Sequence, residues 1–184
     1  MTQTAFTGTT EISIEALKGR IRHVPDFPKP GILFYDVTTL LQDPDGFQLA
    51  VSEMAAPYAN TPIDVVVGIE SRGFIFGAAV ADRLRTGFVP VRKPGKLPST
   101  TRRASYALEY GTDALEIHDD AVSAGQRVLV VDDLLATGGT AAATVGLIKA
   151  LGAEVVGLQF LIELVGLHGR DRLPGETIGA VLEY

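Results

Sequence analysis

The chain has 184 residues, a net charge of −6 at pH 7, and 46% hydrophobic and 21% charged residues. Its length suits one globular domain, and its composition excludes intrinsic disorder of the whole chain. The acidic balance argues against general DNA or RNA binding, which needs a basic excess to neutralise phosphates. The absence of cysteine excludes disulfides, thiol nucleophiles and cysteine-ligated metals.

The start of the chain has neither the basic patch nor the apolar stretch of a secretory signal. Apolar runs elsewhere are too short to span a bilayer. We therefore expect a cytoplasmic protein with no membrane partner. Residues 1–10 are polar and are expected to fray, and residues 1–184 are predicted to form a single domain.

The first third of the chain contains two predicted helices separated by a proline-rich segment. Apolar residues at helical spacing predict a short amphipathic helix over residues 13–21. Three prolines argue against regular structure across residues 24–34, because proline fixes φ and removes a backbone donor. A further helix is predicted over residues 46–58, with Asp45 as its cap.

From residue 63 onward, β-branched runs alternate with helical patterns, which is typical of an α/β fold. The run at 127–132 (RVLVVD) has four consecutive apolar residues, as in a parallel strand covered on both faces. The alternation predicts an open, mostly parallel twisted sheet flanked by helices. The expected strands are 63–68, 88–92, 127–132, 154–161 and 177–182, and the expected helices are 73–84 and 138–151.

One basic segment interrupts this alternation. Residues 93–103 (KPGKLPSTTRR) carry four basic residues, two prolines and a glycine, and predict a long exposed loop. Residues 105–118 alternate around Gly111 and Thr112, which indicates a β-hairpin. The loop and hairpin (93–118) are either a solvated surface or a lid that meets a polyanion, and composition does not separate the two.

The strongest chemical signal is VLVVDDLLATGGT at residues 128–140. A buried strand ends in Asp132 and Asp133, and a Thr/Gly turn then leads into a helix. Glycines let the backbone approach a ligand, and the N–H groups at a helix start bind anions. The two carboxylates can accept hydrogen bonds from vicinal sugar hydroxyls. A sugar that carries a phosphate is the implied ligand.

A plain turn with a threonine cap would explain TGGT alone, but not its attachment to a buried strand and two acids. The chain lacks the GxxxxGK[ST] and GxGxxG fingerprints, and GIESRG is no GxSxG nucleophile elbow. His23, His118 and His168 are isolated in the sequence, and we expect structural or solvated roles for them.

The 128–140 motif resembles the phosphate loop of the type I purine/pyrimidine phosphoribosyltransferase family. Other stretches resemble the members of that family that act on adenine, in their order along the chain. The likeness covers residues 12–184 and rests on VPDFPKPGILFYDVT, GIESRGFIFGAAVA, VRKPGKLP and SYALEYGTDALEIH.

The resemblance implies the type I fold with a flexible hood loop and hairpin. It also implies transfer of the phosphoribosyl group from 5-phosphoribosyl 1-pyrophosphate (PRPP) to adenine, giving AMP and pyrophosphate in purine salvage. Asp132 and Asp133 would hold the ribose hydroxyls. The 5′-phosphate would bind Ala136, Thr137, Gly138, Gly139 and Thr140.

The resemblance places pyrophosphate in a loop that starts at Glu70, whose first peptide bond is often cis in the family. The implied pyrophosphate-binding residues are Ser71, Arg72, Gly73, Arg92, Lys93 and Lys96. Part of this site comes from a neighbouring subunit in related enzymes.

The implied adenine-binding residues are Leu33, Phe34 and Tyr35, with Phe34 stacking on the base and flanking backbone groups reading its edge. Tyr35 stands where relatives carry Arg, which is harmless if this position contributes main chain. Arg102 and Arg103 lie in a stretch that differs among relatives and receive no role.

Glu109 resembles the proton-transfer residue of the family, with Tyr110 beside it closing the flap; an exposed hairpin carboxylate is the plainer alternative. Mg²⁺ would be held mainly by substrate and water rather than by protein ligands. The resemblance also implies a homodimer.

Two other functions remain open from the sequence. One is a non-catalytic regulator that binds PRPP on the same fold. The other is a phosphoribosyltransferase for hypoxanthine, guanine or xanthine. The acidic charge argues against the first, and the segment around Phe34 argues against the second.

Overall fold

The computed structural model describes residues 13–107 and 112–184 and divides the chain into two compact units. The first unit ends at Ala50, and the second is Val51–Tyr184. The single domain over residues 1–184 stays a prediction, and the expected fraying of residues 1–10 lies outside the described residues. Within the described ranges, no helix has the length and apolar character that a bilayer span requires.

The first unit contains a short helix and a two-stranded antiparallel sheet. Helix α1 (Ile14–Lys18) is shorter than predicted and begins after Ser13, whose hydroxyl accepts from the Ala16 N–H. Strand β1 (Arg22–Pro25) pairs with β2 (Leu33–Asp36), and α2 (Thr38–Leu41) follows. The prediction of irregular structure over residues 24–34 was wrong at both ends. Residues 24–25 belong to β1 and residues 33–34 to β2, because a proline is tolerated at the end of an edge strand, and the irregular backbone is confined to residues 26–32.

The next helix, α3 (Pro44–Ala55), continues into a 3₁₀ turn, η1 (Ala56–Tyr58). Asp45 is not its cap, contrary to prediction. The Asp43 carboxylate instead accepts from the N–H groups of Asp45 and Gly46, both at 3.1 Å. The helix starts earlier than expected because Pro44 suits a first helical position, where no backbone donor is needed.

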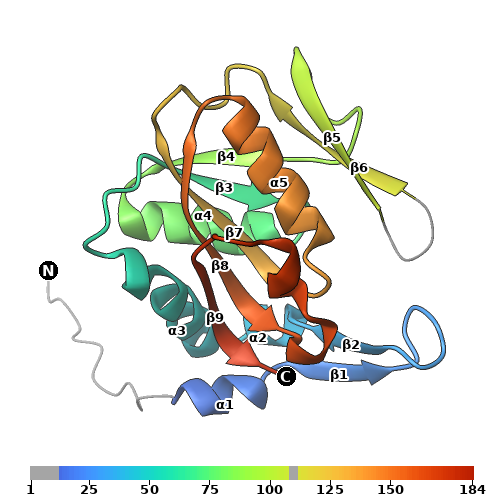
Figure 1. The fold of residues 1–184 in the computed structure, drawn as a ribbon. Coiled ribbons are helices and arrows are strands. Elements are labelled where there is room, and N and C mark those ends of the chain that lie inside the picture. Colours follow the sequence, from blue (N-terminus) through green and yellow to red (C-terminus); the bar gives the residue numbers. More distant parts are fainter. Residues whose placement is uncertain (1–12, 108–111) are drawn as a thin grey trace, which may run out of the picture. The chain divides into compact units, whose positions relative to one another are not determined.

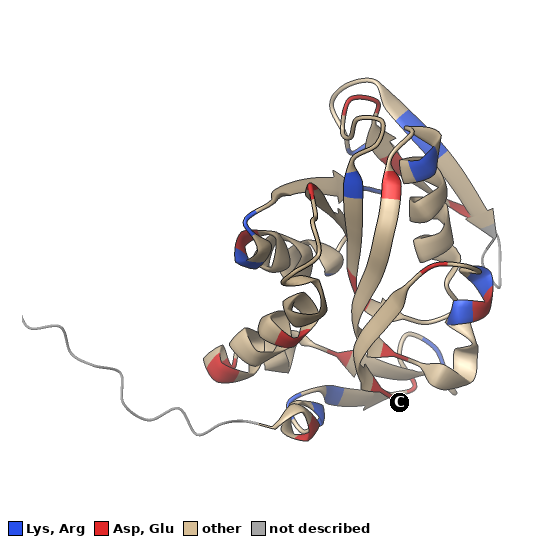
Figure 2. Ribbon diagram, turned by 60° about the vertical axis from the view of Figure 1, so that its left-hand side comes forward, with Lys and Arg blue, Asp and Glu red and all other residues tan. Residues whose placement is uncertain are grey.

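The second unit is built on a five-stranded parallel sheet, which confirms the predicted α/β class (Figure 1). The strands along the sheet are β4 (Gly87–Val91), β3 (Val65–Ile69), β7 (Arg127–Leu135), β8 (Glu154–Glu163) and β9 (Ile178–Glu183). The central strands are uncharged over most of their length, and charges gather at their ends (Figure 2). That distribution is expected of strands covered on both faces.

The strand order reverses between β3 and β7. The chain leaves β3 through α4 (Gly73–Leu84) toward β4, but leaves β7 through α5 (Gly139–Ala150) toward β8 on the other side. With right-handed crossovers, α4 and α5 cover opposite faces of the sheet. Ligands of open α/β sheets bind where the order reverses, beyond the carboxyl ends of the strands. The loop that starts at Glu70, the Asp132–Asp133 pair near the end of β7 and the loop that starts at Ala136 all lie at this point.

The predicted hairpin is present and packs against α5 (Figure 1). It consists of β5 (Thr101–Ala107) and β6 (Thr112–His118), and its turn lies outside the described residues. The Arg102 guanidinium donates to Asp119 at 2.9 Å and to the Ala150 carbonyl at 2.8 Å. Arg102 therefore anchors the hairpin base to the end of α5, a structural role that the sequence did not assign.

The chain after β8 forms two 3₁₀ turns, η2 (Val165–Leu167) and η3 (Gly169–Arg172). Arg170 fixes them by donating to the buried Glu163 carboxylate at 2.5 to 3.0 Å and to the Ile178 carbonyl at 2.9 Å. Glu163 is 5% exposed, so its charge depends on this partner.

We expect Arg170→Met to lower the free energy of unfolding by about 2 kcal/mol, because it leaves a buried carboxylate without its cation. Urea unfolding measures the change. The exposed Arg83→Met is the matched control and should stay within about 0.5 kcal/mol of the wild type. An Arg170 variant as stable as that control would contradict the assignment.

Candidate active site

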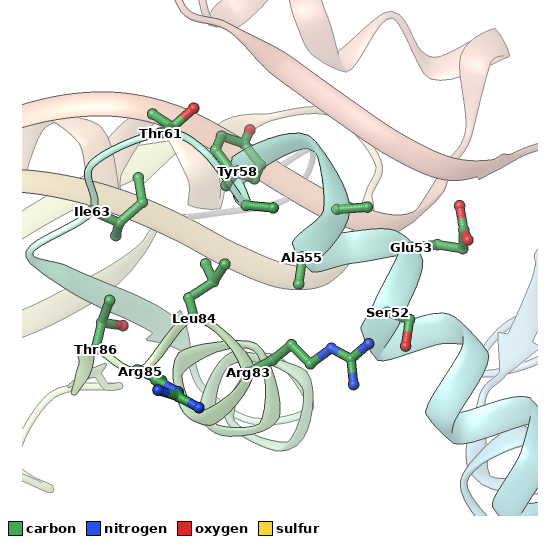
Figure 3. Close-up of a pocket in the computed structure, with 12 residues that line it drawn as sticks. Ser52, Glu53, Ala55, Tyr58, Thr61, Ile63, Arg83, Leu84, Arg85 and Thr86 are labelled. Carbon is green, nitrogen blue, oxygen red and sulfur yellow. The ribbon is translucent and has the colours of Figure 1, made fainter.

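Two cavities of similar volume lie at opposite ends of the parallel sheet. One, of about 570 Å³, opens beyond the carboxyl ends of β3 and β7 and is lined by Ser71, Arg72, Lys93, Lys96, Asp132, Asp133 and Thr140, among others. The other, of about 530 Å³, lies before the starts of β3 and β4 (Figure 3). None of the predicted site residues lines the second cavity, whereas the first unites residues predicted for three subsites.

The two acids of the motif sit at the carboxyl end of β7. The Asp133 N–H donates to Asp132 Oδ1 at 2.9 Å, and Arg72 Nε lies 2.6 Å from Asp133 Oδ2. Asp133 is only 6% exposed, so Arg72 is its counter-charge. This pairing ties the loop after β3 to the acids after β7.

Asp132 is less buried than Asp133: it is partly exposed and lines the cavity. A Cβ added to Gly73 would lie 2.5 Å from Asp132 Oδ1 and 3.1 Å from the Val131 carbonyl oxygen, so only glycine fits at the start of α4. Burial, and then the neighbouring Asp133 charge, raise the pKa of Asp132 well above its usual range.

The predicted phosphate loop encloses a small cavity of about 80 Å³ next to Asp132. Ala136, Thr137, Gly138, Gly139 and Thr140 all line it, and α5 begins at Gly139. Gly138 has a φ of 79°, and a Cβ there would lie 2.2 Å from the Gly169 carbonyl oxygen. Glycine is therefore required both by the backbone conformation and by the neighbouring chain. The helix start directs backbone N–H groups at this cavity, as an anion site requires.

Two of the predicted pyrophosphate cations, Arg92 and Lys96, and the backbone N–H of Lys93 converge on one carboxylate, Glu70. Lys96 Nζ lies 2.9 Å from its Oε1, and Arg92 Nε and the Lys93 N–H lie 3.2 and 3.0 Å from its Oε2. Burial opposes the ionisation of Glu70, but these hydrogen bonds outweigh it and lower its pKa to about 2. The Arg92 guanidinium also lies 5.8 Å from the centre of the Phe74 ring. The peptide bond between Glu70 and Ser71 is cis, as the resemblance implied.

The predicted base-binding residues lie on β2 in the first unit. The Phe34 ring meets Phe27 edge to face, with centroids 5.0 Å apart, and His23 packs on Tyr35 in the same way at 5.1 Å. Among the described strands, β2 pairs with β1 alone. Leu33 is 43% exposed. The predictions for Glu109 and Tyr110 fall outside the described residues.

The structure adds cavity-lining residues that the sequence analysis missed. The sequence places Glu70 at the start of a loop and assigns it no role, whereas in the structure it anchors the basic segment. Tyr106, Asp113 and Leu115 project from the hairpin into the cavity. Alternation along the predicted hairpin could have indicated them, since Tyr106 and Asp113 are cross-strand neighbours on one face.

Comparison with known proteins agrees with this geometry. The family model for the phosphoribosyl transferase domain matches residues 38–173. The adenine phosphoribosyltransferase of Acaryochloris marina is 62% identical over 168 residues, covering 91% of this chain and 99% of that protein.

Solved structures share the fold over nearly the whole chain. The enzyme of that name from Thermoanaerobacter pseudethanolicus superposes with a TM-score of 0.92 at 49% identity, covering 94% of this chain and all of that one. The one from Saccharomyces cerevisiae, solved with adenine and an imino-altritol bisphosphate, gives a TM-score of 0.86 at 40% identity, covering 91% of this chain and 97% of that one.

We expect Asp132→Asn to stabilise the fold by about 1 kcal/mol at pH 8, because it removes a charge beside a second carboxylate. A raised pKa in the folded protein means that the ionised form costs stability at high pH, so the gain should vanish below about pH 3, where the carboxyl is protonated in both the folded and the unfolded protein. Urea unfolding at several pH values measures the effect.

Asp64→Asn is the control, for which we expect the opposite change in stability. Hydrogen bonds from Arg127 lower the pKa of Asp64 to about 2, so this carboxylate contributes stability above pH 4 that is lost as the pH falls toward 2. The control should therefore destabilise the protein at pH 8. A loss of stability in the Asp132 variant at that pH would contradict the account.

Proposed function

The chain belongs to the phosphoribosyltransferase family, and from this premise we propose that it transfers the phosphoribosyl group of PRPP to adenine, releasing AMP and pyrophosphate. The observation that carries the proposal is the meeting of three subsites in unit Val51–Tyr184. The phosphate loop, the Asp132–Asp133 pair and the Glu70-anchored cations all open toward the end of the sheet at which the strand order reverses. Close relatives that carry the name adenine phosphoribosyltransferase support the choice of base.

Each subsite has one task in this reaction. The phosphate loop holds the 5′-phosphate, and Asp132 and Asp133 accept hydrogen bonds from the ribose hydroxyls. Arg72, Arg92, Lys93 and Lys96 neutralise the pyrophosphate as its bond to ribose C1 breaks. Because no enzyme nucleophile is needed, positioning and charge neutralisation supply the catalysis.

The attacking adenine must lose its N9 proton, and we propose Glu109 as the acceptor, with Tyr110 beside it. Adenine would stack on Phe34, and backbone groups of Leu33 and Tyr35 would read the edge of the base. A backbone N–H and a backbone carbonyl together offer one donor and one acceptor, which matches the edge of adenine that carries its amino group.

We propose that Mg²⁺ enters with the pyrophosphate of the donor, as part of the substrate. Among residues 13–107 and 112–184 no three acidic or histidine side chains are grouped to hold a metal ion. Asp133 is already paired with Arg72, and Glu70 with three donors. This donor set fits an ion bound mainly by substrate oxygens and water, where it would neutralise the leaving group.

We also propose a homodimer located in the cytoplasm.

The experiment that tests the function is AMP formation from adenine, PRPP and Mg²⁺, with hypoxanthine, guanine and xanthine assayed in parallel for their own nucleotides. We expect turnover with adenine alone. Donor binding without turnover of any base would instead favour a PRPP-binding regulator. Turnover of a 6-oxopurine would leave the donor site intact and overturn the assignment of Phe34.

A further inference from the structure

The pyrophosphate cations are already paired with carboxylates of the chain itself. Glu70 holds Arg92 and Lys96, and it accepts from the backbone N–H of Lys93. The side-chain ammonium of Lys93 points elsewhere and lies 3.7 Å from Asp113 Oδ2. A pyrophosphate that arrives at Lys93 must therefore compete with a carboxylate that is already there.

The two carboxylates differ in how firmly they are held. The Glu70 side chain is 9% exposed and accepts short hydrogen bonds on both oxygens, so its partners are fixed. The Asp113 side chain is 29% exposed, and its contact with Lys93, itself 56% exposed, is long and solvent-screened. Lys93 is therefore the cation that is most easily released.

Asp113 has a second partner that keeps it in the cavity when Lys93 leaves. Tyr106 faces it across the hairpin, and the Tyr106 hydroxyl donates to Asp113 Oδ2 at 3.3 Å. The Tyr106 oxygen also accepts from Thr140 of the phosphate loop. The phenol can thus hold the Asp113 carboxylate while Lys93 turns to a ligand.

We propose that Asp113 is a resident counter-ion of Lys93 that pyrophosphate displaces, and that Tyr106 is the positioning residue that holds the Asp113 carboxylate once Lys93 has turned to pyrophosphate. This inference rests on the proposed function, because it takes Lys93 as a pyrophosphate contact. The pair limits the affinity for pyrophosphate and so favours its release after the reaction.

The proposal predicts opposite effects for two substitutions in one hydrogen-bonded pair. Asp113→Asn removes the competitor and one negative charge from an anion site, so pyrophosphate should bind more tightly. Tyr106→Phe removes the second partner of the Asp113 carboxylate, so Asp113 should pair more strongly with Lys93 and pyrophosphate should bind more weakly. If Asp113 and Tyr106 only stabilised the hairpin, both substitutions would weaken pyrophosphate binding.

The test is calorimetric titration of the full-length protein with magnesium pyrophosphate at low ionic strength. We expect the Kd to fall about two- to fivefold in Asp113→Asn, the range of an exposed ion pair. It should rise about two- to threefold in Tyr106→Phe, the range of one hydrogen bond. The gain in Asp113→Asn should shrink as salt is added, because screening weakens the pair that the substitution removes.

Asp120→Asn is the matched control. It removes the same charge from the turn after β6, outside the cavity, and should leave the Kd unchanged. Asp113→Ser serves as a second variant if the asparagine form does not fold, with the same expected direction.

An unchanged or raised Kd in the Asp113 variants would overturn the proposal, as would a Kd in Tyr106→Phe that falls or stays constant. These outcomes count against the proposal only if the wild type binds pyrophosphate and turns over adenine. If the wild type does neither, it is the proposed function that fails.

Discussion

The site depends on two carboxylates held at the end of a buried parallel strand. Strand β7 is covered on both faces, so Asp132 and Asp133 leave it in a region of low dielectric, where unpaired charge is costly. Arg72 offsets the charge of Asp133, and the Asp133 N–H binds Asp132. The remaining cost raises the pKa of Asp132. A ribose diol would donate further hydrogen bonds to these acids.

The topology then explains why the other subsites surround this pair. The strand order reverses between β3 and β7, so the loops after these strands open side by side. The close approach of Gly73 to Asp132 and the Arg72–Asp133 ion pair join the two loops. The basic segment after β4 is fixed in turn by Glu70 at the end of β3. The cations of the site are thus arranged before any ligand binds, which lowers the reorganisation that catalysis requires.

The sequence was sufficient where a local pattern determines the structure. The apolar run before Asp132 and the glycines after it predicted the central strand, the glycine turn and the helix that begins at Gly139. It was insufficient where the outcome depends on distant partners. The pairing of β1 with β2 overrode the prolines, and Pro44 shifted the helix start so that Asp43 caps it. Likewise, Glu70 acquires its role only through residues 22 to 26 positions away.

The most direct test of the central claim compares the binding of ribose 5-phosphate and 2-deoxyribose 5-phosphate to the wild type and to Asp132→Asn/Asp133→Asn. If the acids bind the ribose hydroxyls, the wild type should prefer ribose 5-phosphate by about tenfold, the value of one hydrogen bond to a charged group. The double variant should bind both sugars alike, through the phosphate loop alone. A wild type that does not discriminate, or a preference that survives in the variant, would contradict the account.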